Sequence, residues 1–91
     1  MPPAWTDDLS GHSTEEILLA QNENRHWYKE LRLRVNTLIN SKLAKQIGSE
    51  EYSAGRKATT EEAAECRRRF HILTNEIEDR RREAIAAARY R

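Results

Sequence analysis

This sequence has few of the residues that break helices or cross-link chains. Its 91 residues include one cysteine, two prolines and three glycines, and both prolines precede residue 4. A single cysteine excludes an internal disulfide framework. No stretch alternates apolar and polar residues with the β-branched enrichment of a strand. The chain is therefore predicted to be all-α, with long helices that few breakers interrupt.

Long apolar runs are also missing. No run approaches the roughly 20 apolar residues of a membrane-spanning helix, and the first eight residues lack the basic start and apolar core of a signal peptide. We expect a cytoplasmic protein with no membrane partner. Its 16 basic and 15 acidic side chains leave a net charge of +1, which argues against non-specific coating of nucleic acid.

Catalytic and metal-binding motifs are absent as well. Cys66 and His71 stand five residues apart, about 140° around a helix, so they cannot share an ion. Glu23 and His26 have the Glu-x-x-His spacing of a di-iron bundle, but Glu23 is expected to point away from the partner helix. No Gly-rich phosphate loop or nucleophile motif occurs. We expect no enzymatic activity, no metal and no cofactor.

The strongest pattern occupies the last third of the chain. Apolar or small residues recur there at alternating steps of three and four, which is the a/d seam of a coiled-coil-like helix. The seam positions are Ala63, Cys66, Phe70, Leu73, Ile77, Arg80, Ala84 and Ala87. Thr59 and Glu62 fit a capping box. The pattern predicts a helix over 59–91 that needs a partner helix.

A matching helix is predicted over 13–47. Ser13 and Glu16 fit a second capping box, and Gly48 stands where a C′ glycine belongs. Residues 48–58, with two glycines, two serines and four charges, are predicted to form a loop. Two helices of similar length around one loop predict an antiparallel two-helix hairpin over residues 13–91.

The loop position sets an expected register in which facing residue numbers sum to roughly 106. This register pairs Phe70 with Val35, Lys42 with Ala63 and Cys66, and Arg80 with Asn24 and Trp27. Arg80 is the only charge in the second seam, and its guanidinium must be satisfied there or escape to water.

Some apolar residues do not fit this seam. Leu19, Leu33 and Ile72 are predicted to point away from it and to form an off-seam partner-binding surface. Single outward leucines mean little, but several on so short a chain favour a second interface. We expect two hairpins to form a homo-oligomer, most simply a four-helix bundle.

Residues 1–12 are predicted to form a flexible N-terminal arm. Trp5 and Leu9 are its only large apolar residues, on either side of Thr-Asp-Asp. Two interpretations are open. The arm folds back over the helices as a lid, or it is a linear motif that inserts into a partner.

A basic edge is the one feature that suggests a ligand. Arginines fourteen residues apart fall on one edge of the second helix. These residues are Arg67, Arg68, Arg81, Arg82 and Arg89, and the first helix adds Arg25, Lys29 and Arg32. The alternative is a solvated face held by local ion pairs, namely Glu65–Arg69, Glu76–Arg80 and Glu78–Arg82.

These features predict a non-enzymatic protein–protein interaction module, such as a small adaptor, inhibitor or regulator. It would self-associate and dock on a protein partner with an acidic surface. The alternative is a nucleic-acid-binding protein that uses the basic edge, although no helix-turn-helix, RRM or KH pattern occurs.

Overall fold

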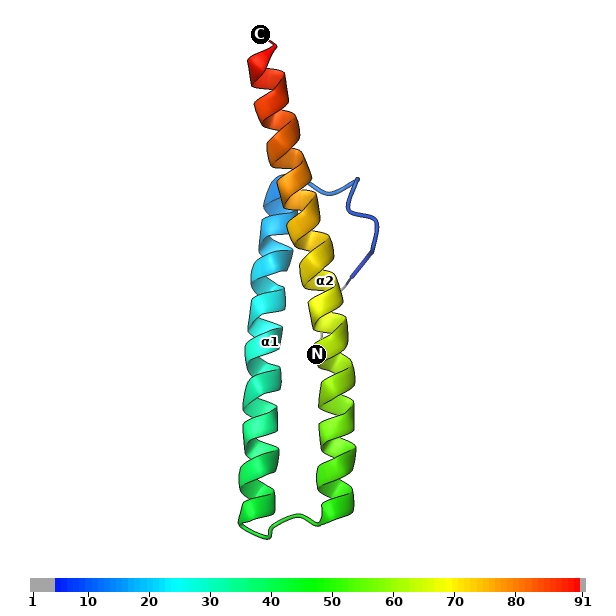
Figure 1. Cartoon of the computed structure of the whole chain (residues 1–91), viewed down its shortest axis with the longest axis vertical. Helices are drawn as coiled ribbons and strands as arrows, with labels where there is room; N and C mark the ends of the chain where they lie inside the picture. Colours follow the sequence, from blue (N-terminus) through cyan, green and yellow to red (C-terminus); the bar gives the residue numbers. More distant parts are fainter. Residues whose placement is uncertain (1–4, 91) are drawn as a thin grey trace.

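The computed structural model describes residues 5–90 as two long antiparallel helices joined by a short turn (Figure 1). Helix α1 covers Thr14–Leu43 and helix α2 covers Ser49–Arg89. No strand occurs within residues 5–90. The predicted all-α helical hairpin is confirmed. Residues 1–4 of the predicted arm, and Arg91 of the predicted second helix, lie outside the described residues.

Helix α1 begins where its sequence predicts. The Ser13 side chain accepts a hydrogen bond from the Glu16 backbone N–H at 3.1 Å, which satisfies a donor that the first turn leaves unpaired. The helix ends at Leu43 and not at residue 47, because the chain reverses through Lys45 in the left-handed region, with φ of 57°. Gly48, expected to close α1, instead precedes α2 with an extended backbone.

The predicted loop over 48–58 is wrong, because residues 49–58 form the first three turns of α2. Gly55 is present there for close helix packing and not for a turn. A Cβ atom at this position would meet Leu38 Cδ2 at 2.8 Å. Thr59, predicted as an N-cap, lies inside the helix, where its hydroxyl donates to the Gly55 carbonyl at 2.8 Å.

The earlier turn shifts the helix register, so the predicted pairings are also wrong. Every residue of α1 faces a residue nearer the N-terminus of α2 than expected. The Asn24 side-chain amide donates to the carbonyl of Cys66 at 3.1 Å. The Lys42 ammonium lies over the Tyr52 ring, 4.5 Å from its centroid. Arg80 reaches the start of α1 and not its middle.

The core consists of two small clusters along the helix interface. One contains Leu9, Ile17 and Leu73, and the other contains Trp27, Leu31 and Cys66. Phe70, predicted at the centre of the seam, is 38% exposed. The buried line of α2 follows Thr59, Cys66 and Leu73 at steps of seven, and in the shifted register Phe70 stands at the edge of that line. The predicted burial of Phe70 is therefore wrong.

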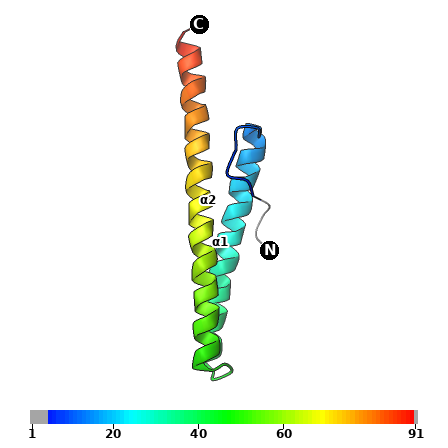
Figure 2. The ribbon, with the colours of Figure 1, turned by 90° about the vertical axis from the view of Figure 1, so that its right-hand side faces the viewer.

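Helix α2 extends past the start of α1, as Figures 1 and 2 show. It has 41 residues against 30 in α1, and residues 81–90 are all exposed. The predicted seam positions Ala84 and Ala87 therefore face no partner helix within residues 5–90. Neither α1 nor α2 is long and apolar enough to cross a membrane.

Candidate functional site

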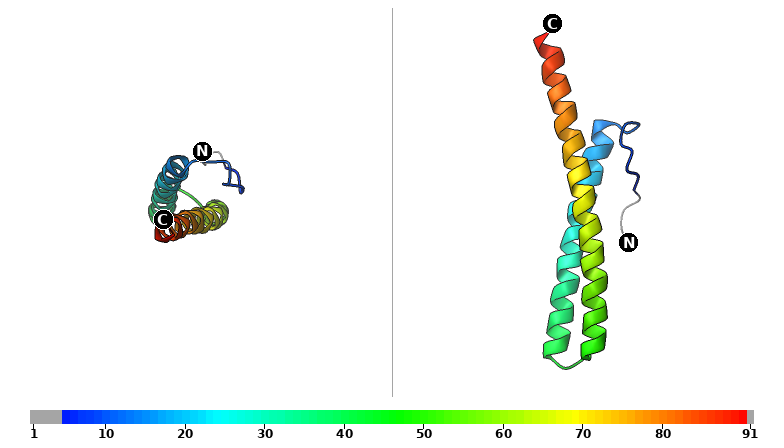
Figure 3. Two further views of the ribbon diagram at one scale, coloured as in Figure 1. Left: turned by 90° about the horizontal axis from the view of Figure 1, so that it is seen from above. Right: turned by 45° about the vertical axis from the view of Figure 1, so that its right-hand side comes forward.

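Residues 5–13, which we call the strap, fold back along one side of the helix pair (Figures 2 and 3). Leu9 is 8% exposed and packs with Ile17 and Leu73. Trp5 and Ile72 pack against the same cluster. Of the two interpretations of the arm, the structure shows the lid over residues 5–12, in which Trp5 and Leu9 pack on the helices and most of the other residues are exposed.

Arg80 holds the base of the strap. Its guanidinium donates to the carbonyl oxygens of Leu9 and His12, at 3.0 and 2.7 Å, and to the Thr14 hydroxyl at 3.1 Å. Its Nε donates to Glu76 at 2.9 Å. The half-buried seam charge is thus paired with one carboxylate and three further oxygen acceptors. Its partners are Leu9 and His12 before α1, Thr14 at the start of α1 and Glu76 of α2, and not Asn24 and Trp27 as the predicted register had it.

Arg69 lies between two indole rings. Its Cζ atom is 5.1 Å from the ring centroid of Trp5 and 5.1 Å from that of Trp27. Its side chain is 13% exposed, and its Nε donates to Glu65 at 3.0 Å. Two cation–π contacts and an ion pair fix this guanidinium between the strap and α1.

Arg68 joins the strap to α2 through a second set of charges. It donates to Asp7 at 3.0 Å and to both oxygens of Glu65, at 2.8 and 2.6 Å. Hydrogen bonds from Arg68, and then from Arg69, lower the pKa of Glu65 to about 2. Hydrogen bonds from the Trp5 indole and then from Arg68 lower the pKa of Asp7. On this side of the molecule, arginines and carboxylates neutralise one another.

The arginines of the predicted basic edge are all exposed, but they do not form a continuous unpaired row. Arg68 is neutralised as described, and Arg82 approaches Glu78 and Asp79 at 3.9 and 3.7 Å. The pairs of the solvated-face alternative are present at 3.0, 2.9 and 3.9 Å, in the order Glu65–Arg69, Glu76–Arg80 and Glu78–Arg82. Within residues 5–90, Arg67, Arg81 and Arg89 form no ion pair.

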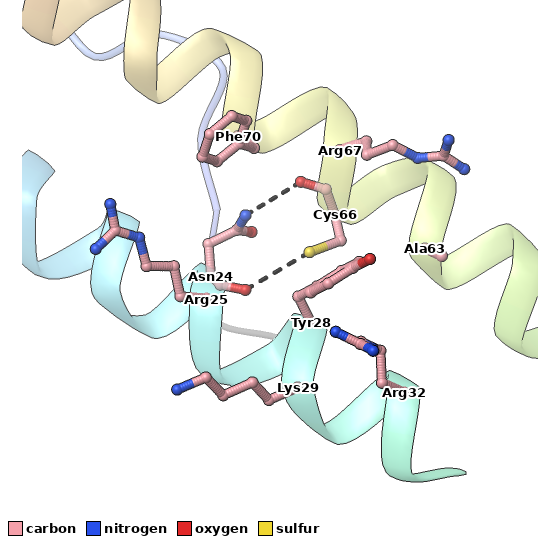
Figure 4. Close-up of a pocket in the computed structure, with 9 residues that line it drawn as sticks. All are labelled: Asn24, Arg25, Tyr28, Lys29, Arg32, Ala63, Cys66, Arg67 and Phe70. Carbon is pink, nitrogen blue, oxygen red and sulfur yellow. Dashed lines mark hydrogen bonds between the residues drawn. The ribbon is translucent and has the colours of Figure 1, made fainter. Parts of the chain in front are cut away.

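A groove of about 670 Å³ runs between the helices on the other side of the seam (Figure 4). Cys66 lies on its floor and Phe70 on its rim. Its lining residues are Asn24, Arg25, Tyr28, Lys29, Arg32, Ala63, Cys66, Arg67 and Phe70. None of these residues is acidic. The groove therefore combines two exposed rings, Tyr28 at 46% and Phe70 at 38%, with a border of positive charge.

The cations of this groove have no counter-ion within residues 5–90. They are Arg25, Lys29 and Arg32 of α1 and Arg67 of α2. The sequence explains this, because none of the positions three and four residues away from any of them is acidic. The α1 members are instead neighbours of one another on one helix face, where like charges repel.

A polar pair crosses the groove floor between α1 and α2. Asn24 is 3% exposed; its amide donates to the Cys66 carbonyl, and the Cys66 thiol approaches the Asn24 carbonyl oxygen at 3.6 Å. The Asn24 Oδ1 atom has no hydrogen-bond partner among the described residues. Burial raises the pKa of the Cys66 thiol, so the thiol stays protonated near neutral pH and is a poor nucleophile. The pair aligns the helices.

The off-seam apolar residues have different outcomes. Leu19 and Leu33 point outward as predicted, 59% and 65% exposed. Ile72 does not, because it packs against the cluster that the strap completes with Leu9. Its assignment to an outer surface is wrong, because the strap folds over this part of α2 and brings Leu9 into the cluster that Ile72 contacts.

The chain matches no protein-family model, no curated protein and no solved structure. Its function is inferred from its own surfaces. In the part of the chain that the structure describes, no group of three His, Cys, Asp or Glu residues could hold a metal ion.

Proposed function

We propose that this protein is a non-enzymatic protein-interaction module that docks an acidic segment of a partner protein in the groove between α1 and α2. One observation carries the proposal: Arg25, Lys29, Arg32 and Arg67 border exposed aromatic rings and have no counter-ion within residues 5–90. Converging cations raise the local potential and attract an anionic ligand. Adaptors, inhibitors and regulators work through such surfaces.

The geometry of the groove suggests the form of the ligand. The α1 cations lie within eight residues, Arg25 to Arg32, and the seven steps between them cover about 10 Å of helix. A peptide with two or three carboxylates over that distance could neutralise them. Tyr28 and Phe70 offer faces on which an aromatic or aliphatic side chain of the same peptide would pack. Charge complementarity would then set the orientation, and apolar burial would supply much of the affinity.

A protein ligand fits better than nucleic acid. A phosphate backbone needs a long row of free cations, and ion pairs at Arg68 and Arg82 interrupt the basic edge. The net charge of +1 gives little long-range attraction. A nucleic-acid-binding protein is therefore the alternative function, and it is separated from the first by experiment.

Self-association belongs to the same proposal. Leu19 and Leu33 stand fourteen residues apart on one face of α1, and both are exposed. A second hairpin packed on this face would give the four-helix bundle and homodimer expected from the sequence. The cytoplasmic location remains a prediction.

Fluorescence anisotropy tests the docking proposal. The probes are a labelled peptide of alternating Glu and Phe, the same peptide with Gln in place of Glu, and RNA and duplex DNA of similar length. We expect the acidic peptide to bind, and the double variant Arg25→Glu/Arg67→Glu to bind it about tenfold more weakly. The control Arg81→Glu/Arg89→Glu changes the charge equally outside the groove and should bind like the wild type.

Two outcomes would count against protein docking. Equal binding of the acidic and Gln peptides would remove the role of the cations. Preferential binding of RNA or DNA, with a steep fall in affinity as salt rises, would establish the alternative function. For self-association, sedimentation at micromolar concentration should show a dimer that Leu19→Glu/Leu33→Glu dissociates, and a wild-type monomer would contradict it.

A further inference from the structure

The first residues of the strap contact the helices as a short bound peptide would. Trp5, Asp7 and Leu9 alternate along a non-helical segment with Thr6 and Asp8, which are exposed. Trp5 stacks on Arg69, Asp7 pairs with Arg68, and Leu9 enters the apolar cluster. The aromatic, acidic and aliphatic contacts are therefore made at every second residue.

The surface beneath this segment comes from both helices. Arg68, Arg69 and Leu73 of α2 lie beside Ile17 and Trp27 of α1. It is distinct from the groove, because Arg69 and Phe70 stand about 100° apart around α2, on either side of the buried line. The surface thus joins two guanidinium groups to an apolar depression, and one chain segment already fills it.

The segment is held by contacts that can be exchanged. The Asp7–Arg68 pair is exposed on both partners, at 65% and 44%, and exposed pairs contribute little stability. Trp5 is half-buried, and of residues 5–9 only Leu9 is buried, with its carbonyl also accepting from Arg80. A longer peptide that repeated these contacts and added others would bind the surface more tightly than the segment does.

A turn separates this segment from α1. Residues 10–13 form it, the His12 N–H donates to the Leu9 carbonyl at 3.1 Å, and nothing lies within 4 Å of a Cβ atom built on Gly11. The helix cap at Ser13 and the Arg80 contacts to His12 and Thr14 involve none of residues 5–9. Residues 5–9 can therefore leave the surface with the loss of the Arg80 bond to the Leu9 carbonyl, while Ser13 still caps α1.

We propose that the surface beneath residues 5–9 is a second recognition site, for a partner-protein segment with an acidic residue between an aromatic and an aliphatic one. The chain's own segment occupies this site and limits access to it. A partner must compete with a ligand that is tethered at high effective concentration. The site becomes available when a stronger segment of the same chemistry displaces residues 5–9.

The test uses the full chain and a labelled peptide of sequence WTDDLS, which copies residues 5–10. Asp7→Arg places like charges at Arg68 and should release the strap. We expect the peptide to bind this variant about tenfold more tightly than the wild type, because the tethered competitor is removed. Adding Arg68→Gln to Asp7→Arg should weaken the binding, because the peptide loses its cationic partner and a neutral side chain cannot form a new ion pair with the introduced arginine.

The controls separate this site from the groove and from misfolding. Arg25→Glu/Arg67→Glu in the Asp7→Arg background should leave peptide binding unchanged, so failure of one proposal does not entail failure of the other. Circular dichroism verifies that the helices persist. If Asp7→Arg loses helicity, Trp5→Ala removes the contacts of the segment with Arg69 and the apolar cluster without adding a charge, and it should still bind the peptide more tightly than the wild type.

Three results would overturn the proposal. They are equal affinity of the wild type and the strap variant, binding that Arg68→Gln leaves unchanged, and sedimentation of the wild type as a dimer that Asp7→Arg dissociates. The last result would make a second copy of this chain the occupant, through exchange of residues 5–9.

Discussion

The two sides of the helix pair differ in how their cations are neutralised. On the strap side, Arg68, Arg69 and Arg80 each meet a carboxylate of the same chain, and Arg80 also meets backbone carbonyls. On the groove side, Arg25 and Arg67 meet none within residues 5–90. A net charge of +1 conceals this asymmetry. One side therefore contains its own counter-charges, whereas these cations of the other side have none within residues 5–90.

The difference has a local origin in helical spacing. Glu65 stands three and four residues before Arg68 and Arg69, which is the spacing at which side chains on a helix meet. Lys29 has Arg25 four residues before it and Arg32 three residues after it. The strap side therefore stabilises the monomer, while the groove side carries repulsion that an acidic ligand would relieve.

The largest expected effect compares a core residue under the strap with a ring in the groove. Leu73 is fully buried and Phe70 is 38% exposed. Leu73→Ala should lower the free energy of unfolding by about 2–5 kcal/mol, and Phe70→Ala should lower it by less, because water already reaches its ring. Chemical denaturation gives both values. The reverse ranking would show that Phe70, as the sequence pattern predicts, is the true core residue.

Arg80→Leu should have the next largest effect. The substitution leaves the carbonyl oxygen of His12 without its donor and removes one of the two donors to that of Leu9, which also accepts from the His12 N–H. This should cost about 1–3 kcal/mol. The heptad pattern alone predicts the opposite, since leucine suits a seam better than arginine. A thermal melt decides between them. A rise in melting temperature, or a change in oligomeric state at constant stability, would show that Arg80 serves alignment alone.

Neutralising one cation on each side tests the comparison directly. Arg68→Gln should lower stability, because it removes ion pairs to Asp7 and Glu65. Lys29→Gln should raise stability by about 0.2–0.5 kcal/mol, because it removes repulsion from like charges on the same face. Both effects should shrink as salt is added. Loss of stability in both variants would mean that the two sides do not differ.

The smallest effect concerns acid. The pKa of Glu65 is lowered from 4.5 to about 2, so the Glu65 carboxylate binds a proton less tightly in the folded protein than in the unfolded chain. Its contribution to stability is complete above about pH 4.5 and is lost as pH falls toward 2. Denaturation midpoints measured across this range should fall less steeply in Glu65→Gln than in the wild type. An equal dependence of the midpoint on pH in the two proteins would show that groups other than Glu65 cause the acid sensitivity.

Local chemistry determined much of this molecule from the sequence. The Ser13 cap, the scarcity of breakers and the heptad spacing of Cys66 and Leu73 specify two helices that must pair, because each signal acts within a few residues. The unpaired cations of the groove can also be predicted from local sequence. Arginines and lysines with no acidic neighbour three or four positions away are recognisable by inspection, and this criterion would have separated Arg25 and Arg67 from Arg68.

Only the tertiary structure determined the position of the turn and the helix register that follows from it. Glycine serves both in turns and where helices pack closely, so local sequence cannot distinguish the two roles of Gly48 and Gly55. Because the chain reverses between Leu43 and Ser49 and not over 48–58, the register differs from the predicted one along the whole interface. That shift brought Arg67 beside Arg25 and Arg80 beside the strap. Which distant charges meet is set by the position of the chain reversal, because residues on separate helices share no local spacing that could encode it.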